Sequence, residues 1–180
     1  MSSVIELVAL DITDQELLSS LCAEVPTTYP FQCRIGAAEK LPVSALDMHR
    51  GQYQATRILE HLASSDRDAV RLLGITTADL FTPILRYIFG EAMLPGKAAI
   101  VSTHRLGNLS RGTQPPCDRP LFISRVIKEG IHELGHTFGL THCADPSCVM
   151  TASREMARID AKSTQLCRYC RILLDDFLTA

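Results

Sequence analysis

The stretch HELGHTFGLTHCADPSCVM, residues 132–150, combines three histidines, a glutamate, two cysteines and a methionine. His132 and His136 are four residues apart, so on a helix they project from one face and can hold one metal ion between them. Glu133 is turned away from this pair around the helix, where it could reach a water on the metal without being a ligand. The stretch therefore predicts a metal site on a helix with a general base beside it.

Gly139 and His142 extend this pattern. Gly139 comes three residues after His136, where a residue that tolerates positive φ can end the helix and turn the chain back. The turn would return His142 to the metal as a third ligand. Three neutral imidazoles leave a tetrahedral Zn²⁺ one open position, and the pKa of water bound there falls to about 7. Zinc is the preferred ion, although Co²⁺ or Ni²⁺ accept similar ligands.

Four cysteines form two closely spaced pairs after the third histidine. Cys143 directly follows His142, Cys148 comes soon after, and Cys167 and Cys170 form a C-x-x-C pair. Four thiolates make a closed tetrahedral site without a position for water, so a structural zinc is expected here. The alternatives are two disulfides or a redox-active C-x-x-C pair. The remaining cysteines have no such spacing and are expected to be small buried or free thiols: Cys22, Cys33 and Cys117.

The histidine motif resembles that of metzincin peptidases. Five residues match the pattern H-E-x-x-H-x-x-G-x-x-H: His132, Glu133, His136, Gly139 and His142. Met150, with a cysteine pair on either side of it, narrows the resemblance to the archaemetzincin family. Three upstream segments are also similar to that family, so the likeness covers most of the chain: residues 50–59, 74–81 and 89–106.

The resemblance implies a zinc-dependent peptidase with two zinc ions per chain, one catalytic on the histidines and one structural on the four cysteines. It implies that Glu133 is the general base and that Met150 lies in a turn below the catalytic metal. It also implies that a strand at residues 97–103 forms the rim of the cleft and pairs with an extended peptide or protein substrate. Endopeptidase and aminopeptidase activity are not distinguished.

Each of these implications has a plainer alternative. Met150 would otherwise be an ordinary core methionine, and residues 97–103 an ordinary strand of the sheet. The domain as a whole would otherwise be a non-catalytic module that binds peptides or proteins and is held together by zinc. Glu133 favours the enzyme, because a scaffold has no need of that residue.

Length and composition predict one globular domain over residues 1–180, 46% hydrophobic and 21% charged. The resemblance implies the class α/β (α+β), metzincin-like, with a twisted mixed sheet, a backing helix and an active-site helix. We expect an upper part at residues 1–139 and a small C-terminal part at residues 140–180, stapled by the structural zinc.

Hydrophobic periodicity locates the elements. Strands are expected at residues 3–11, 29–36, 68–76, 86–90 and 97–103, and helices at residues 15–25, 52–65, 119–138 and 167–178. Asp14 is expected to cap the first helix, and Pro120 to lie in the first turn of the third. Gly130, inside that helix, suggests a close contact with a neighbouring element.

The charged residues are balanced, with 18 basic and 20 acidic side chains and a net charge of −2. Scattered basic residues predict neither a nucleic-acid groove nor a patch for anionic membranes. No apolar run approaches the roughly 18 to 20 residues of a membrane span. Seven cysteines without a signal peptide indicate a reducing compartment, so a cytoplasmic protein, expected to be monomeric, is predicted.

Several other polar residues are candidates for supporting roles at the site. Candidates for the donor that stabilises the oxyanion are nearby backbone amides and the side chains of Tyr87, His104 and Tyr169. Candidates for the acceptors that orient the histidine rings are Asp145 and Asp160. His61 is expected at a helix surface. The segment 105–119, rich in glycine, proline and polar residues, is expected to border the active site.

Overall fold

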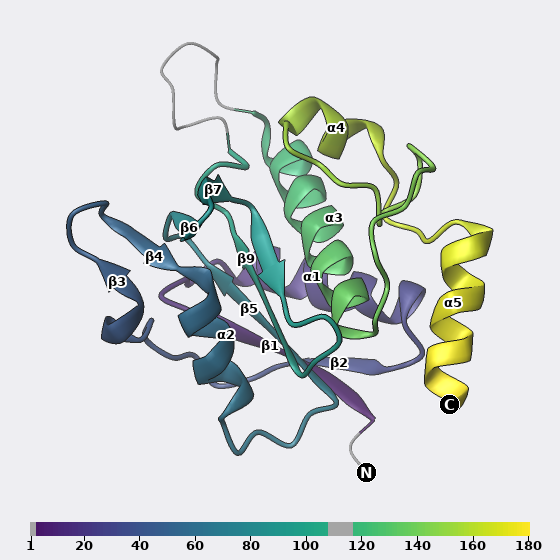
Figure 1. Ribbon diagram of the computed structural model, residues 1–180, viewed down its shortest axis with the longest axis horizontal. Helices are drawn as coiled ribbons and strands as arrows, with labels where there is room; N and C mark the ends of the chain where they lie inside the picture. The colour runs from purple at the N-terminus through teal and green to yellow at the C-terminus, as the bar shows by residue number, and fades with distance from the viewer. Residues whose placement is uncertain (1–2, 108–116) are drawn as a thin grey trace.

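The computed structural model describes residues 3–107 and 117–180, and its centre is a five-stranded mixed sheet (Figure 1). The strand order is β2-β1-β5-β9-β8. The first four strands are parallel, and β8 runs antiparallel to β9 at the edge. Their bounds are Val4–Leu10 for β1, Gln32–Ile35 for β2, Arg71–Thr76 for β5, Gly90–Ala92 for β8 and Ala98–Ser102 for β9.

A second, smaller sheet has the order β3-β4-β6-β7. Its strands are Leu46–Asp47 for β3, Gln52–Gln54 for β4, Leu80–Thr82 for β6 and Leu85–Ile88 for β7. Residue Phe89 alone separates β7 from β8, so the chain passes directly from this sheet to the edge of the central one. The smaller sheet therefore stands beside the edge strand β8.

Helices cover both faces of the central sheet. Helices α1 (Gln15–Thr28) and α3 (Arg119–Thr137) pack on one face, and α2 (Ala55–Ala63) packs on the other (Figure 1). Alternation along β1 explains the two cores, because Leu7 belongs to the cluster with α1 and α3 whereas Val8 belongs to the cluster with α2. The sheet is thus buried on both sides, as parallel strands require.

The remaining helices are short or lie near the C-terminus. They are the 3-10 helix η1 (Val43–Ala45), α4 (Met156–Ala161) and α5 (Arg168–Thr179). No helix within the described ranges combines the length and the apolar character needed to cross a bilayer. The mixed α/β class expected from the sequence is confirmed.

Two aspartates begin the helices that carry most of the packing. The Leu17 N–H donates to Asp14 Oδ1 (3.1 Å), and the Leu121 N–H donates to Asp118 Oδ1 (2.9 Å). Each bond satisfies an amide that the first helical turn leaves free. The cap expected at Asp14 is confirmed. Gly130 also has its close contact, because a Cβ there would lie 2.9 Å from Leu21 Cδ1 of α1.

The sequence-based element boundaries are wrong in three places. The helix expected over residues 52–65 begins only at Ala55, because Gln52–Gln54 pairs with β6 as strand β4. Strand β6 itself was not expected. The single strand expected at residues 86–90 is two strands, β7 and β8, in different sheets. All three errors lie where pairing between strands overrides the pattern of the single segment.

Candidate metal centres and active site

The histidine motif lies at the end of α3 and in the turn that follows. His132 and His136 are on the last two turns of the helix, which ends at Thr137. Gly139 has φ +80°, and the N–H groups of Gly139 and Leu140 donate to the carbonyls of His136 (2.9 Å) and Gly135 (3.1 Å). This left-handed cap turns the chain back, as the glycine predicted. It brings His142 to the other two imidazoles.

The three imidazoles converge as ligands of one ion. One nitrogen from each of His132, His136 and His142 lies within 4.8 Å of the others, and the Nε2 atoms of His132 and His136 are 3.1 Å apart. Two nitrogens on a tetrahedral zinc are separated by about 3.4 Å, because each Zn–N bond is about 2.0–2.1 Å. The spacing of the donor set therefore fits zinc.

Main-chain carbonyls orient two of the rings. His132 Nδ1 lies 2.8 Å from the Val149 carbonyl, and His136 Nδ1 lies 2.7 Å from the Leu140 carbonyl. Each Nδ1–H donates to its carbonyl, so both Nε2 lone pairs face one another and need a cation between them. Burial lowers the pKa of His132 well below its ordinary value, which keeps the ring neutral as a metal ligand must be.

Neither of the candidate aspartates, Asp145 and Asp160, is the acceptor for His132 or His136. Asp160 forms a bidentate ion pair with Arg125, at 2.7 Å for both contacts. Asp145 accepts a hydrogen bond from the Ser147 N–H (2.9 Å) in its own turn. Backbone acceptors cannot be read from side-chain identities, which explains the error.

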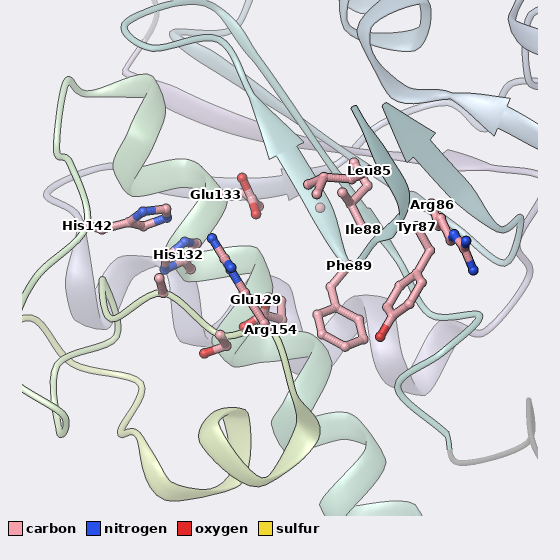
Figure 2. A pocket seen from close by; sticks show the side chains of 13 residues that line it. Leu85, Arg86, Tyr87, Ile88, Phe89, Glu129, His132, Glu133, His142 and Arg154 are labelled. Atoms are coloured by element: carbon pink, nitrogen blue, oxygen red, sulfur yellow. The ribbon is translucent and has the colours of Figure 1, made fainter. Parts of the chain in front are cut away.

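Glu133 is buried at the wall of a cavity of about 450 Å³ that it shares with His132 and His142 (Figure 2). Burial raises the pKa of Glu133 well above its usual range, and the nearby carboxylate of Glu129 adds to the rise. Strand β8 approaches closely here, because a Cβ on Gly90 would lie 2.7 Å from Glu133 Cγ. A carboxylate in this position faces the space in front of the imidazoles and can exchange a proton there.

Met150 is fully buried against the helix that carries the ligands. A Cβ on Gly135, between the two helical histidines, would overlap the Met150 sulfur, so glycine is required for this contact. The Met150 carbonyl accepts a hydrogen bond from the Cys143 N–H (3.0 Å). The methionine therefore packs below the motif and ties the returning chain to it.

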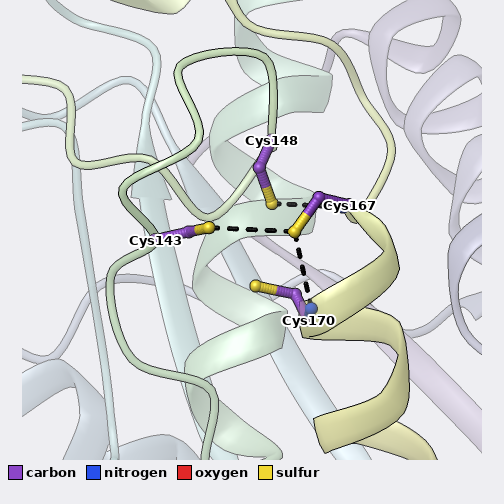
Figure 3. Close-up of side chains that lie close together, drawn as sticks. All are labelled: Cys143, Cys148, Cys167 and Cys170. Atoms are coloured by element: carbon purple, nitrogen blue, oxygen red, sulfur yellow. Dashed lines mark hydrogen bonds between the residues drawn. The ribbon is translucent and has the colours of Figure 1, made fainter.

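The four paired cysteines form a second cluster (Figure 3). Their sulfurs lie within 4.8 Å of one another, and Cys143 Sγ is 3.8 Å from Cys167 Sγ. Two sulfurs on a tetrahedral zinc are about 3.8 Å apart, because Zn–S is about 2.3 Å, whereas a disulfide needs about 2.05 Å. All seven cysteines are free thiols, so the disulfide alternative is wrong.

Backbone amides point at these sulfurs. The Cys167 N–H donates to Cys148 Sγ (3.3 Å), the Asp145 N–H to Cys143 Sγ (3.4 Å), and the Cys170 N–H to Cys167 Sγ (3.5 Å). Donors of this kind stabilise thiolates, and Cys167 also caps the N-terminus of α5. The Cys170 hydrogen bond lowers the pKa of Cys167. The donor set suits a structural metal ion.

The other candidates from the sequence are scattered. Tyr87 lines the cavity with Glu133, whereas His104 lines a neighbouring cavity and Tyr169 lies beside the four cysteines. His61 lies on the helix surface as expected, with its Nε2 3.1 Å from Glu39 Oε2. In the segment expected to border the site, residues 108–116 lie outside the described residues.

The strand expected to form the rim of the cleft is the wrong one. Strand β9, the centre of residues 97–103, is paired with β5 on one side and β8 on the other, so it has no free edge for a substrate. The plainer alternative, an ordinary sheet strand, is correct for it. The free edge beside Glu133 belongs to β8.

Three site residues were missed in the sequence: Glu129, Arg154 and Lys162. Lys162 is completely buried and pairs with Glu129 at 2.8 Å, and Glu129 lines the cavity one helical turn before Glu133. Arg154 extends into the same cavity (Figure 2). The spacing of Glu129 and Glu133 could have indicated a shared face of the helix, but nothing in the local pattern marked Lys162 or Arg154.

Comparisons with known proteins agree with this geometry. The sequence profile of peptidase family M54 matches residues 6–176. The chain is 44% identical to an archaemetzincin of Methanopyrus kandleri over 135 residues, which cover 75% of this chain and 73% of the relative. It is 36% identical to an archaemetzincin of Pyrococcus furiosus over 185 residues, covering 99% and 95% of the two chains.

Solved structures show the same fold. The crystal structure of the archaemetzincin from Methanopyrus kandleri is similar with a TM-score of 0.87 and 37% identity, covering 99% of this chain and 97% of that one. A zinc-dependent peptidase from Methanocorpusculum labreanum is similar with a TM-score of 0.82 and 29% identity, covering 94% and 99%.

Proposed function

The chain belongs to peptidase family M54, the archaemetzincins, and is a zinc metallopeptidase; from this premise we propose that it hydrolyses peptide bonds at the three-histidine site with Glu133 as the general base. The observation that carries the proposal is the convergence of His132 and His136, whose Nε2 atoms lie 3.1 Å apart while each Nδ1 is held by a carbonyl.

Two zinc ions per chain are proposed. His132, His136 and His142 would hold the catalytic ion, and the four clustered cysteines the structural one: Cys143, Cys148, Cys167 and Cys170. A zinc ion on three histidines supplies a Lewis acid and lowers the pKa of a water in its open position. On this proposal the chain divides into an upper part at residues 1–139 and a C-terminal part at residues 140–180.

Glu133 is proposed to move the proton. Its carboxylate faces the cavity in front of the imidazoles, where it can take a proton from the attacking water and pass it to the leaving amine. The burial that raises its pKa also makes it a stronger base than an exposed glutamate. Gly90 supports this role, because any larger residue there would displace the carboxylate.

A peptide substrate is proposed to pair with β8. This strand has one unpaired edge in the central sheet, and its first residue, Gly90, contacts Glu133. An extended peptide that adds to this edge would bring its scissile carbonyl to the imidazoles through main-chain hydrogen bonds. Antiparallel pairing is the more stable geometry.

We also propose that the protein is cytoplasmic and monomeric, as the sequence analysis predicts.

The decisive experiment is Glu133→Gln, with Glu133→Ala beside it. Both variants should keep both metals by elemental analysis and lose at least about 100-fold in kcat on a peptide library, because the proton acceptor is gone. Glu155→Gln, an exposed glutamate outside the cavity, is the control and should keep parental activity. Parental cleavage by Glu133→Gln would disprove the assignment of the base. A metal-loaded parent that binds peptides without cleaving any would favour the binding module.

A further inference from the structure

A second cavity adjoins the one that contains Glu133. It has a volume of about 790 Å³ and shares Arg86 and Tyr87 with the first cavity of about 450 Å³. These two residues lie at the end of the first cavity opposite His142 (Figure 2). A chain bound in front of the histidines could therefore continue past Tyr87 into the second cavity, which is large enough for a side chain.

Positive charge dominates the lining of this second cavity. Three arginines line it, Arg50, Arg86 and Arg105, together with the imidazole of His104 and a single acid, Asp79. The whole chain has a net charge of −2, so this cation excess is a local feature and does not follow from the composition. A recess lined by one sign of charge concentrates ligands of the opposite sign.

The single acid is already neutralised by an arginine. Arg105 contacts Asp79 through Nε (2.7 Å) and Nη2 (2.6 Å), and its guanidinium stacks 4.1 Å from the Tyr87 ring centre. Gln52 Nε2 donates to the same carboxylate at 2.8 Å. Although burial opposes the shift, the hydrogen bonds from Arg105 and Gln52 lower the pKa of Asp79. Because Asp79 is bound to Arg105, it is not available as an ion-pair partner for Arg50 or Arg86.

Arg50 and Arg86 keep uncompensated charges. Arg50 stacks 4.0 Å from the Phe81 ring centre and donates from Nε to Gln52 Oε1 (3.0 Å), so neutral groups hold its guanidinium in place. The Arg86 side chain is exposed and has no ion pair or hydrogen bond with any described residue. A planar guanidinium offers a pair of parallel donors that matches a carboxylate.

We propose that the cavity lined by Arg50, Arg86 and Arg105 is a substrate subsite that binds the carboxylate of an aspartate or glutamate side chain. The inference rests on the proposed peptidase function and names its substrate class: polypeptides with an acidic residue at a set distance from the scissile bond.

The position of that residue follows from the strand geometry. Gly90 marks the reacting centre because it contacts Glu133, and Arg86 precedes it by four residues along the chain. An extended chain rises about 3.3 Å per residue, so the two points are up to about 13 Å apart. A substrate paired antiparallel with β8 would run from the level of Gly90 toward Arg86 as it approaches its own C-terminus. The acid is therefore placed three or four residues after the scissile bond.

The test uses fluorescence-quenched peptides that share one cleavable core. Each peptide has Glu, Gln or Lys at a single position from five residues before to five residues after the scissile bond. We expect kcat/KM to be about five- to tenfold higher for Glu than for Gln at the third or fourth position after the bond, with Lys the poorest. The Glu preference should shrink as salt is raised, because the arginines are accessible to solvent.

Arginine variants assign the preference to the cavity. In Arg86→Gln and Arg50→Gln the ratio of kcat/KM for Glu and Gln peptides should fall toward one. Arg158→Gln is the matched control, because it removes the same charge from an exposed helix position outside the cavity and should keep the parental ratio. If Arg86→Gln and Arg50→Gln both keep the parental ratio, the acid is bound elsewhere and the proposal is wrong.

Two further measurements separate this inference from the function on which it rests. Equal kcat/KM for the Glu and Gln peptides at every position would disprove the subsite, whereas the proposed peptidase function would still hold. Fluorescence anisotropy with Glu133→Gln measures binding without hydrolysis. A Kd about five- to tenfold lower for the Glu peptide than for the Gln peptide would support the subsite even if the parent cleaved nothing. A preference only for a free C-terminal carboxylate, lost on amidation, would overturn the proposal of a side-chain ligand.

Discussion

His142 and Cys143 are consecutive in the chain, and their side chains point into two different ligand clusters. His142 meets the imidazoles of α3, whereas Cys143 Sγ lies 3.8 Å from Cys167 Sγ. One peptide unit therefore joins the three-histidine cluster to the four-cysteine cluster, which on the proposed function would be an open and a closed zinc site. The closed site would hold the backbone from which His142 reaches the other metal.

This relationship predicts that the two metals are coupled. Cys167→Ser keeps a good N-cap for α5 but removes one thiolate, so the structural zinc should be lost. The affinity for the catalytic zinc should then fall by at least about tenfold, because His142 is no longer held. Competition with a chromogenic chelator measures both affinities. Cys22→Ser, outside the cluster, is the control, and an unchanged catalytic affinity in Cys167→Ser would refute the coupling.

Chelation should remove the two ions in order. The three-histidine site has fewer protein ligands, and its cavity opens to solvent, whereas four thiolates close the other site. Under mild chelation the zinc content should fall from two per chain to one with loss of activity and no change in circular dichroism. Simultaneous loss of both ions with unfolding would show that the sites are not separable.

Gly139→Ala should damage both stability and activity. A residue with a Cβ at φ +80° costs about 1–2 kcal/mol, and here that Cβ would lie 3.3 Å from Phe177. Gly51→Ala is the matched control, because φ is +63° there and no atom lies within 4 Å of the new Cβ. Urea unfolding should show a lower free energy of unfolding in both variants. Gly139→Ala should also lose activity, since the turn after it carries His142, whereas Gly51 lines the cavity of Arg50 and Arg86 and its variant is the control for stability alone.

Asp14 should stabilise the fold in a pH-dependent way. The hydrogen bond from Arg119 lowers the pKa of Asp14 from 3.8, so its contribution is present above that value and disappears as the pH falls through the lowered pKa. Asp14→Ala should reduce the free energy of unfolding by about 1 kcal/mol at neutral pH. Asp14→Asn keeps a helix cap but removes the negative charge, so its difference from the parent measures the ion pair with Arg119. A difference between parent and Asp14→Asn that stays constant into acid would contradict this account.

The sequence predicted that the three histidines gather, because their geometry is local. Spacing of four places His132 and His136 on one helical face, and Gly139 reverses the chain within a few residues. Asp14 and the strands around β1 and β5 were also found, since caps and buried apolar runs depend on neighbours in the chain.

The errors share a non-local cause. Gln52–Gln54 continues the amphipathic pattern of α2 but becomes a strand because β6 pairs with it. The resemblance predicts that β9 lies at the rim of the cleft, but the free edge belongs to β8. Only the strand order decides which strand lies outermost. The acceptors for His132 and His136 are backbone carbonyls, which have no signature in side-chain identity.

The amino-acid sequence by itself indicated the three histidines and each pair of cysteines, because helical period, a glycine turn and the short spacing within a pair act over a few residues, whereas the two cysteine pairs meet only in the folded chain. Only the tertiary structure decided which strand edge faces Glu133, that Lys162 is buried against Glu129, and that arginines from three separate segments line one cavity. Those relationships join residues far apart in the chain, so they exist only once the sheets and helices have packed.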